Sequence, residues 1–226
     1  MLDKLNYRYE TLEIGDLDVH LRSLKDIQEF QDIDNKALDV GINDTVWPIF
    51  GVLWPSGFVM ATIMEQFEIK DKKILEIGCG LGLSSLVLKL RNADITATDY
   101  NPAVETFLKE NTRINQIDNI PFFRADWTDA HLSSIDYYDL IVGSDILYES
   151  SHTKDLAHFI NKRSKKNCVV MIIDANRGHI NRFTREMKKH HFIHEKDNQE
   201  FYERFNILFK GSVNFYIRTS AKKINI

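Results

Sequence analysis

A glycine-rich segment in the first half of the chain is the strongest candidate for a ligand-binding loop. The segment Gly78-Cys79-Gly80-Leu81-Gly82 directly follows a short apolar run at 73–77. Glycines let backbone N–H groups approach a ligand closely, where a side chain would block the approach. Glu76 lies near the end of this apolar run, and Asp99 lies at the end of the next one. The sequence therefore predicts a ligand-binding loop with two carboxylates beside it.

The spacing of the glycines separates two classes of ligand. A dinucleotide-binding fingerprint, GxGxxG, would need a small residue at Leu83, whereas the third glycine of this chain falls at Gly82. The GxGxG spacing favours S-adenosylmethionine as the ligand. Asp99 would then accept hydrogen bonds from the ribose hydroxyl groups. The alternative role of Asp99 is to cap a helix that starts at Pro102.

Further cofactor contacts are expected at the ends of the neighbouring strands. Tyr100 directly follows Asp99, and Asp126-Trp127 follows the third predicted strand. Asp126 can reach the adenine amino group there and Trp127 can cover a ring face, unless Trp127 is a core residue. We interpret Cys79 as a small side chain of the cofactor loop rather than as a nucleophile, because no histidine is near it in the sequence.

The elements that must position these residues alternate along the chain. Strands are expected at 73–77, 93–98, 122–125, 139–143 and 168–173. Helices are expected at about 55–67, 83–90 and 102–115, and after the fourth strand, where Leu156, Phe159 and Ile160 have helical spacing. This alternation predicts parallel pairing and an α/β fold, a doubly wound, mostly parallel, seven-stranded Rossmann-like sheet.

The two ends of the chain depart from this alternation. Apolar runs at 205–209 and 213–217 flank Lys210-Gly211-Ser212, which predicts a C-terminal antiparallel hairpin. Alternating runs at 9–14 and 17–21 predict a second hairpin near the N-terminus.

Size and composition suit one compact domain with a small extension. The chain has 226 residues, of which 43% are hydrophobic and 27% are charged. We divide it into an N-terminal β extension, 1–46, and a main domain, 47–226. The apolar runs are too short to cross a bilayer, and the net charge of -4 gives no general attraction to nucleic acid.

Cysteine and histidine usage further limits the classes of protein. The only two cysteines, Cys79 and Cys168, cannot form a disulfide framework, and the N-terminus lacks a basic-then-apolar signal pattern. A cytoplasmic location is expected. Four histidines occur between positions 179 and 194, but their spacing matches no usual set of metal ligands. No metal site is predicted.

Taken in order, the motifs resemble those of the seven-β-strand protein lysine methyltransferases that carry a DxxY signature. The resemblance covers most of the chain from about Trp54 onward. Its anchors are Trp54-Pro55-Ser56-Gly57, the segment 76–82, Thr98-Asp99, Asp126-Trp127, and Gly143-Ser144-Asp145-Ile146-Leu147-Tyr148. The resemblance implies a class I methyltransferase fold for residues 47–226. The chain departs from the family pattern in its N-terminal residues and in the connection from 174 to 200.

Carried over by position, the resemblance implies a role for each matching residue. It implies cofactor contacts for Trp54, Gly78, Gly80, Asp99, Trp127 and Ser144. Together with the residues singled out above, the complete predicted cofactor set is Trp54, Glu76, Gly78, Cys79, Gly80, Gly82, Asp99, Tyr100, Asp126, Trp127 and Ser144. Asp145 and Tyr148 would be the catalytic residues at the entry of the target amine. An amine must be neutral to attack a methyl carbon, yet a lysine has a pKa of ~10.4 in water, so a carboxylate and a phenol suit its binding and orientation. Their alternative role is structural, at the junction of the fourth strand and the next helix.

The resemblance favours an S-adenosylmethionine-dependent N-methyltransferase that modifies a protein lysine and releases S-adenosylhomocysteine. One alternative acceptor is a small-molecule amine or heteroaromatic nitrogen, as in nicotinamide-type enzymes. A second alternative is a protein without catalytic activity, which binds the cofactor as a sensor or an assembly partner. A nucleic-acid base methyltransferase is disfavoured, because Ser144-Asp145-Ile146 lacks the prolines of the [DN]PP[YFW] motif. A monomer is favoured, without a membrane or nucleic-acid partner.

Overall fold

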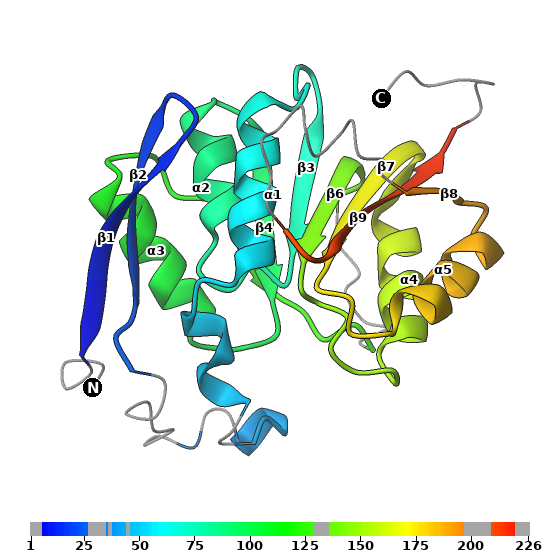
Figure 1. Ribbon diagram of the computed structural model, residues 1–226, viewed down its shortest axis with the longest axis horizontal. Helices are drawn as coiled ribbons and strands as arrows, with labels where there is room; N and C mark the ends of the chain where they lie inside the picture. The colour runs from blue at the N-terminus through cyan, green and yellow to red at the C-terminus, as the bar shows by residue number, and fades with distance from the viewer. Residues whose placement is uncertain are drawn as a thin grey trace.

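A seven-stranded sheet forms the centre of the molecule (Figure 1). The computed structural model describes residues 6–26, 35, 38–43, 46–128, 136–196 and 209–219. The strand order is β5-β4-β3-β6-β7-β9-β8. The strands are β3 (Lys73–Ile77), β4 (Asp94–Asp99), β5 (Phe122–Arg124), β6 (Tyr138–Ser144), β7 (Ser164–Asp174), β8 (Ile193–Lys196) and β9 (Ser212–Arg218). Strands β3 to β7 pair in parallel and β9 is antiparallel to both neighbours, which confirms the predicted mostly parallel α/β fold.

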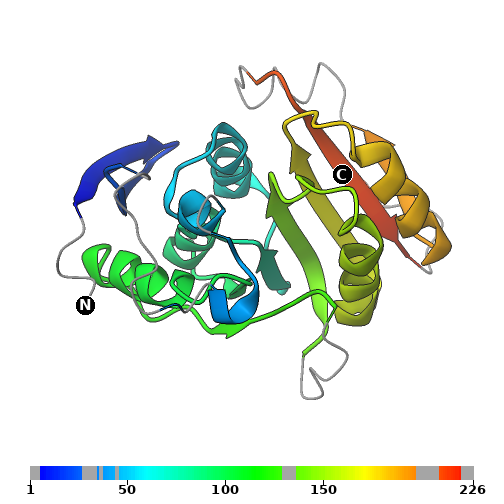
Figure 2. The ribbon, with the colours of Figure 1, turned by 90° about the horizontal axis from the view of Figure 1, so that it is seen from below.

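Helices cover both faces of this sheet (Figure 2). They are α1 (Pro55–Gln66), α2 (Leu83–Leu90), α3 (Val104–Ile114), α4 (Thr153–Arg163) and α5 (Ile180–Lys189). Helices α1 to α3 pack on one face and α4 and α5 on the other. The central strand β3 is buried on both faces because its successive side chains serve both layers: Ile74 lies in the first hydrophobic cluster and Leu75 in the second.

Helix α5 lies in the segment that the sequence interpretation treated only as a connection. Its apolar residues Phe183 and Met187 are fully buried, whereas Arg182, Arg185 and Lys188 are exposed. This spacing of four gives a narrow apolar stripe on a basic helix. Helix α3 begins at Val104 rather than at the predicted Pro102, because Asn101 first forms a turn in which its Oδ1 accepts the Ala103 N–H at 2.9 Å.

The antiparallel pair at the C-terminal side of the sheet consists of β8 and β9. Ile193 pairs with Ile217, and Lys196 pairs with Asn214. The His194 ring stacks on Tyr216 at 4.9 Å, and its Nε2 is 2.9 Å from Asn214 Oδ1. Strand β9 thus matches the predicted run at 213–217. Of the predicted partner run at 205–209, residues 205–208 lie outside the described residues.

A two-stranded hairpin, β1 (Tyr7–Ile14) and β2 (Leu17–Leu24), stands beside α2 and α3 (Figure 1). Val19 and Leu21 are fully buried in the same hydrophobic cluster as the main sheet. Asn111 of α3 accepts the Arg22 N–H at 2.8 Å, and the Arg22 guanidinium lies 4.7 Å from the Phe107 ring centroid. The hairpin therefore shares the core of the main domain. The division at residue 46 remains a prediction.

Residues 47–66 are the one described segment that is long and apolar enough to cross a membrane. In the fold this segment is not one continuous helix. It comprises the 3-10 helix η4 (Trp47–Gly51), an extended link and α1. Met60, Ile63 and Met64 of α1 are fully buried against the sheet. These residues therefore have the environment of a core helix in a folded domain.

Candidate functional site

A cavity of about 580 Å³ opens at the carboxyl ends of the parallel strands. Gly78, Asp99, Asp126 and Ser144 line it, and these residues follow or end strands β3, β4, β5 and β6, respectively. The sheet order reverses between β3 and β6, and ligands of open α/β sheets bind at such a switch point. The volume lies within the range of small-molecule sites. All predicted site residues except Gly82 line this cavity.

The glycine loop has the backbone conformation that its composition indicates. Gly78, Gly80 and Gly82 have φ angles of 62°, 52° and 75°, in the left-handed region that glycine adopts readily. A Cβ added to Gly80 would lie 3.0 Å from the Phe50 carbonyl oxygen, and one added to Gly78 would lie 2.6 Å from an Ile146 methyl group. The loop thus forms a narrow cradle that only glycine fits.

Asp99 fixes this loop from the neighbouring strand. Its Oδ2 accepts the Gly80 N–H and its Oδ1 accepts the Asn101 N–H, both at 2.9 Å. Burial raises the pKa of the Asp99 carboxyl, and these backbone hydrogen bonds oppose the rise. Each carboxylate oxygen keeps a second lone pair, so Asp99 has acceptor capacity left for ligand hydroxyls.

Glu76 links strand β3 to the start of α2. Only 3% of its surface is exposed, and its Oε2 accepts both the Ser85 N–H, at 2.9 Å, and the Ser85 hydroxyl. Burial raises the pKa of Glu76 to about 7, against the opposing effect of the Ser85 hydrogen bonds. Glu76 therefore holds the start of α2 against the end of β3, on either side of the glycine loop, and it also lines the cavity.

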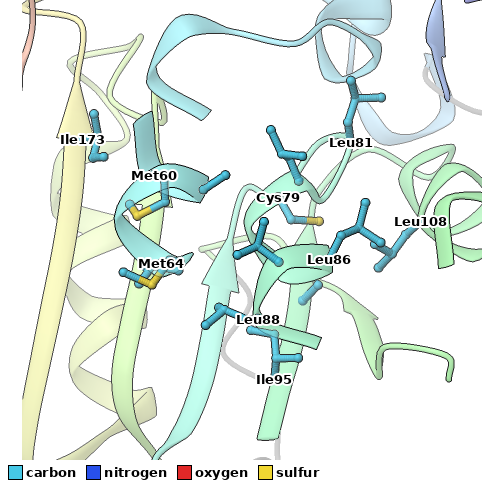
Figure 3. Close-up of a cluster of buried hydrophobic side chains, with 14 of the residues drawn as sticks. Met60, Met64, Cys79, Leu81, Leu86, Leu88, Ile95, Leu108 and Ile173 are labelled. Atoms are coloured by element: carbon cyan, nitrogen blue, oxygen red, sulfur yellow. The ribbon is translucent and has the colours of Figure 1, made fainter. Parts of the chain in front are cut away.

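Two other loop residues have mainly structural environments. The Cys79 side chain lies in a cluster of buried apolar side chains that includes Leu81, Leu86 and Leu108 (Figure 3), and burial raises its thiol pKa well above the usual value. A thiolate nucleophile is therefore disfavoured at this position. Gly82 is the N-cap residue of α2, and a Cβ there would lie 2.5 Å from a Leu108 methyl group. Its predicted role in cofactor binding stays a prediction.

A cover formed by residues 40–43 and 46–53 lies along one side of the cavity. Two residues after β4 hold it in place: the Tyr100 hydroxyl donates to the Val40 carbonyl, and Asn101 Nδ2 donates to the Trp47 carbonyl at 2.8 Å. Asn101 is buried. Tyr100 thus lies in the cavity wall, where the sequence placed it, and also anchors a cover that the sequence did not predict.

Three of the rings that line the cavity contact one another. The His152 ring is edge-on to both Trp127, at 6.0 Å, and Tyr148, at 6.1 Å. Asp126 Oδ1 accepts hydrogen bonds from the N–H and hydroxyl of Thr128, which leaves its second oxygen for other contacts. His152 lines the cavity and was not among the predicted site residues. Its sequence position, four residues after Tyr148, was the available signal.

Tyr148 lies at the rim, with 46% of its surface exposed. Partial burial of the phenol, together with the charges of Asp99 and Glu149, raises the pKa of Tyr148 to about 12. The phenol is therefore neutral near pH 7 and can donate or accept a hydrogen bond. Trp54 is 36% exposed at the same rim, and its Nε1 donates to the Ile49 carbonyl at 3.1 Å.

Asp145 makes a contact that the sequence did not indicate. Its two carboxylate oxygens each accept a hydrogen bond at 2.8 Å from Arg177, which follows β7. The Arg177 guanidinium carbon lies 6.0 Å from the Trp54 ring centroid. Asp145 has a φ of 53°, unusual for a residue with a side chain. Strained residues of this kind cluster at functional sites.

The charges that line the cavity suit a cationic ligand. Six lining residues are acidic, namely Glu76, Asp99, Asp126, Asp145, Glu149 and Asp155, and Arg177 is the only lysine or arginine among the described lining residues. In the part of the chain that the structure describes, no group of three His, Cys, Asp or Glu side chains is placed to hold a metal ion. The glycine cradle, Asp99 and the aromatic walls fit an organic cofactor with a positively charged centre.

Comparisons with known proteins point to one family. A family model described as lysine methyltransferase matches residues 32–195. The chain is 27% identical over 173 residues to a calmodulin-lysine N-methyltransferase of Arabidopsis thaliana, covering 70% of this chain and 57% of the relative. It is also 27% identical over 150 residues to the protein N-lysine methyltransferase METTL21A of Xenopus tropicalis, covering 64% of this chain and 69% of the relative.

Solved structures support the fold. The T. thermophilus 16S rRNA N2 G1207 methyltransferase, in complex with AdoMet and guanosine, superimposes with a TM-score of 0.66. That similarity covers 97% of this chain and 52% of the other, at 13% sequence identity. Identity at this level is evidence for a shared fold and not for a shared substrate.

Proposed function

The chain belongs to the lysine methyltransferase family, and we propose that it transfers a methyl group from S-adenosylmethionine to the ε-amine of a lysine side chain in a protein. S-adenosylmethionine is the cofactor. We assign cofactor binding to the glycine loop, Asp99 and the walls formed by Tyr100 and Trp127. We assign the acceptor end of the cavity to Asp145 and Tyr148.

The reaction requires a neutral amine in line with the methyl group. S-adenosylmethionine supplies an electrophilic methyl carbon: the amine nitrogen bonds to it while the carbon–sulfur bond breaks, which leaves S-adenosylhomocysteine. Asp145 would bind the acceptor as an ammonium and orient it. Tyr148, neutral because its pKa is raised to about 12, would hold the nitrogen by a hydrogen bond rather than act as a base. The proton passes to solvent, which reaches this exposed rim.

The exposed rim is the observation that favours a protein acceptor. Tyr148 is 46% exposed and Trp54 is 36% exposed, and both line the cavity beside Asp145. A side chain that projects from a large molecule can reach such a rim, whereas enzymes for small molecules bury most of the ligand surface. This openness supports a lysine side chain over a small-molecule amine. The intact glycine loop and acidic rim support an enzyme over a cofactor-binding sensor.

The proposal is tested by incubating the full chain with methyl-labelled S-adenosylmethionine and a cell lysate. We expect label in a discrete, protease-sensitive band, and we expect Asp145→Asn to remove it. Glu105→Gln is the matched control, because Glu105 is exposed on α3 away from the cavity. Label confined to small molecules, or a band that persists unchanged in Asp145→Asn, would refute the proposal.

We further propose that the protein works in the cytoplasm as a monomer, without a nucleic-acid or membrane partner. The proposal is supported by the free thiols of Cys79 and Cys168, the net charge of -4 and the burial of the apolar face of α1. Cell fractionation and light scattering on the purified chain test the location and the oligomeric state. Recovery in the membrane fraction or a stable dimer would contradict them.

A further inference from the structure

Arg177 is held in a turn that directs it toward the acceptor end of the cavity. The two residues beside it, Asn176 and Gly178, have φ angles of 61° and 91°. Asn176 Nδ2 donates to the Lys210 carbonyl at 2.9 Å, and the Asn176 N–H donates to Asp174 Oδ2 at 2.9 Å. Asn and Gly are the residues that tolerate this conformation. The turn therefore fixes the direction in which Arg177 leaves the sheet.

The guanidinium of Arg177 lies between a carboxylate and an indole. Its Nε and Nη2 each donate to Asp145 at 2.8 Å, in a bidentate pair. Its guanidinium carbon is 6.0 Å from the Trp54 ring centroid. The side chain of Asp145 is only 8% exposed, whereas that of Arg177 is 41% exposed. A buried anion is thus paired with a cation that can leave toward solvent.

A carboxylate beside an aromatic ring is also the environment that suits a lysine ammonium. Both oxygens of Asp145 are engaged by Arg177, so an ammonium that binds Asp145 must replace at least one of those hydrogen bonds. The two cations therefore compete for one anion. Lysine, with a compact ammonium on a flexible chain, lacks the planar fork that makes the arginine pair bidentate.

We propose that Arg177 is an internal competitor for the acceptor site, which the acceptor ammonium must displace from Asp145 and Trp54. This inference rests on the proposed function and adds a determinant of substrate specificity to it. A free amine can displace Arg177 only through the contacts that its own ammonium group makes. A protein acceptor has further contacts around the exposed rim, so the competition selects protein lysines over small amines.

The test uses titration calorimetry to measure the binding of n-butylammonium to the full chain, which is first saturated with S-adenosylhomocysteine. Arg177→Gln should lower the dissociation constant of n-butylammonium at least fivefold relative to the unchanged protein. The double variant Arg177→Gln with Asp145→Asn should lose that gain. Arg185→Gln, on the exposed side of α5, should bind like the unchanged protein.

The opposite role predicts the opposite result. If Arg177 only positioned Asp145, then Arg177→Gln would weaken n-butylammonium binding and Arg177→Lys would restore it. Weaker or unchanged binding in Arg177→Gln, or no binding by any variant, would overturn the inference. If Arg177→Gln does not fold, Arg177→Lys replaces it in the test, because this variant keeps a cation in the turn. In that case the proposal requires Arg177→Lys to bind n-butylammonium more tightly than the unchanged protein.

This outcome is distinguishable from the test of the proposed function. Label on a protein lysine together with unchanged amine binding would overturn only the role of Arg177. Tighter amine binding in Arg177→Gln without label on any protein would overturn only the protein-lysine assignment.

Discussion

Glu76 gives the folded state a specific dependence on pH, which Glu76→Gln should remove. The carboxyl is 3% exposed, and burial raises its pKa from 4.5 to about 7. Glutamine can still accept both hydrogen bonds from Ser85, because both go to the same oxygen of Glu76. The substitution therefore removes the titration of this side chain and keeps both Ser85 hydrogen bonds.

The sign and size of the effect follow from the direction of the shift. Because the folded state holds the proton more tightly than the unfolded state, the contribution of Glu76 to stability is fully present below pH 4.5 and is lost as the pH rises through about 7. A pKa rise of this size corresponds to roughly 3 kcal/mol, most of which falls between pH 5 and pH 8.

Urea unfolding of the two proteins at pH 5 and pH 8 measures this contribution. Relative to the unchanged protein, Glu76→Gln should gain about 2 to 3 kcal/mol in the free energy of unfolding between pH 5 and pH 8. Glu105→Gln is the control, since this exposed glutamate pairs with Lys109 at the surface and its substitution should show a difference below about 0.5 kcal/mol. An identical pH dependence in the unchanged protein and in Glu76→Gln would refute the account of this buried carboxyl.

Three further substitutions test other parts of the site. Gly80→Ala should lower the free energy of unfolding by about 1 to 2 kcal/mol and weaken cofactor binding, because φ is 52° and the new Cβ meets the Phe50 carbonyl. Urea unfolding measures the first effect and calorimetry the second. Unchanged values would contradict the conclusion that only glycine fits this position of the loop. Tyr148→Phe should leave the cofactor dissociation constant within about twofold of that of the unchanged protein. It should lower kcat roughly tenfold, because one hydrogen bond that positions the amine is lost. An unchanged kcat would show that the phenol has no role in the mechanism. Asn101→Ala should destabilise the fold by about 1 to 3 kcal/mol and loosen the cover over the cavity, because the hydrogen bond from Asn101 Nδ2 to the Trp47 carbonyl is lost. Unaltered unfolding and cofactor affinity would show that the cover is held by other contacts.

The parts of the fold that the sequence predicted are those with local, periodic signals. Strand β3 and helix α2 are continuous in sequence, and the glycine loop between them has a composition that follows from its backbone angles. Asp99 was predictable because the end of β4 must lie beside the end of β3 in a parallel sheet. These inferences needed no knowledge of distant contacts.

The parts that escaped prediction depend on contacts between distant segments. Arg177 reaches Asp145 across 32 residues, and Tyr100 reaches Val40 across 60. Neither pair has a local pattern in the sequence that would reveal it. Helix α5 did leave a signal, since Phe183 and Met187 are four residues apart, but the many charges around them obscured it.

The most direct test of the central claim is the identity of the methylated side chain. Protein labelled by the full chain with methyl-labelled S-adenosylmethionine is hydrolysed to amino acids and separated against standards. The account predicts that the label elutes with Nε-methylated lysine and is absent when Asp145→Asn replaces the unchanged chain. Label that elutes with methylated histidine or arginine, or that never enters protein, would contradict it.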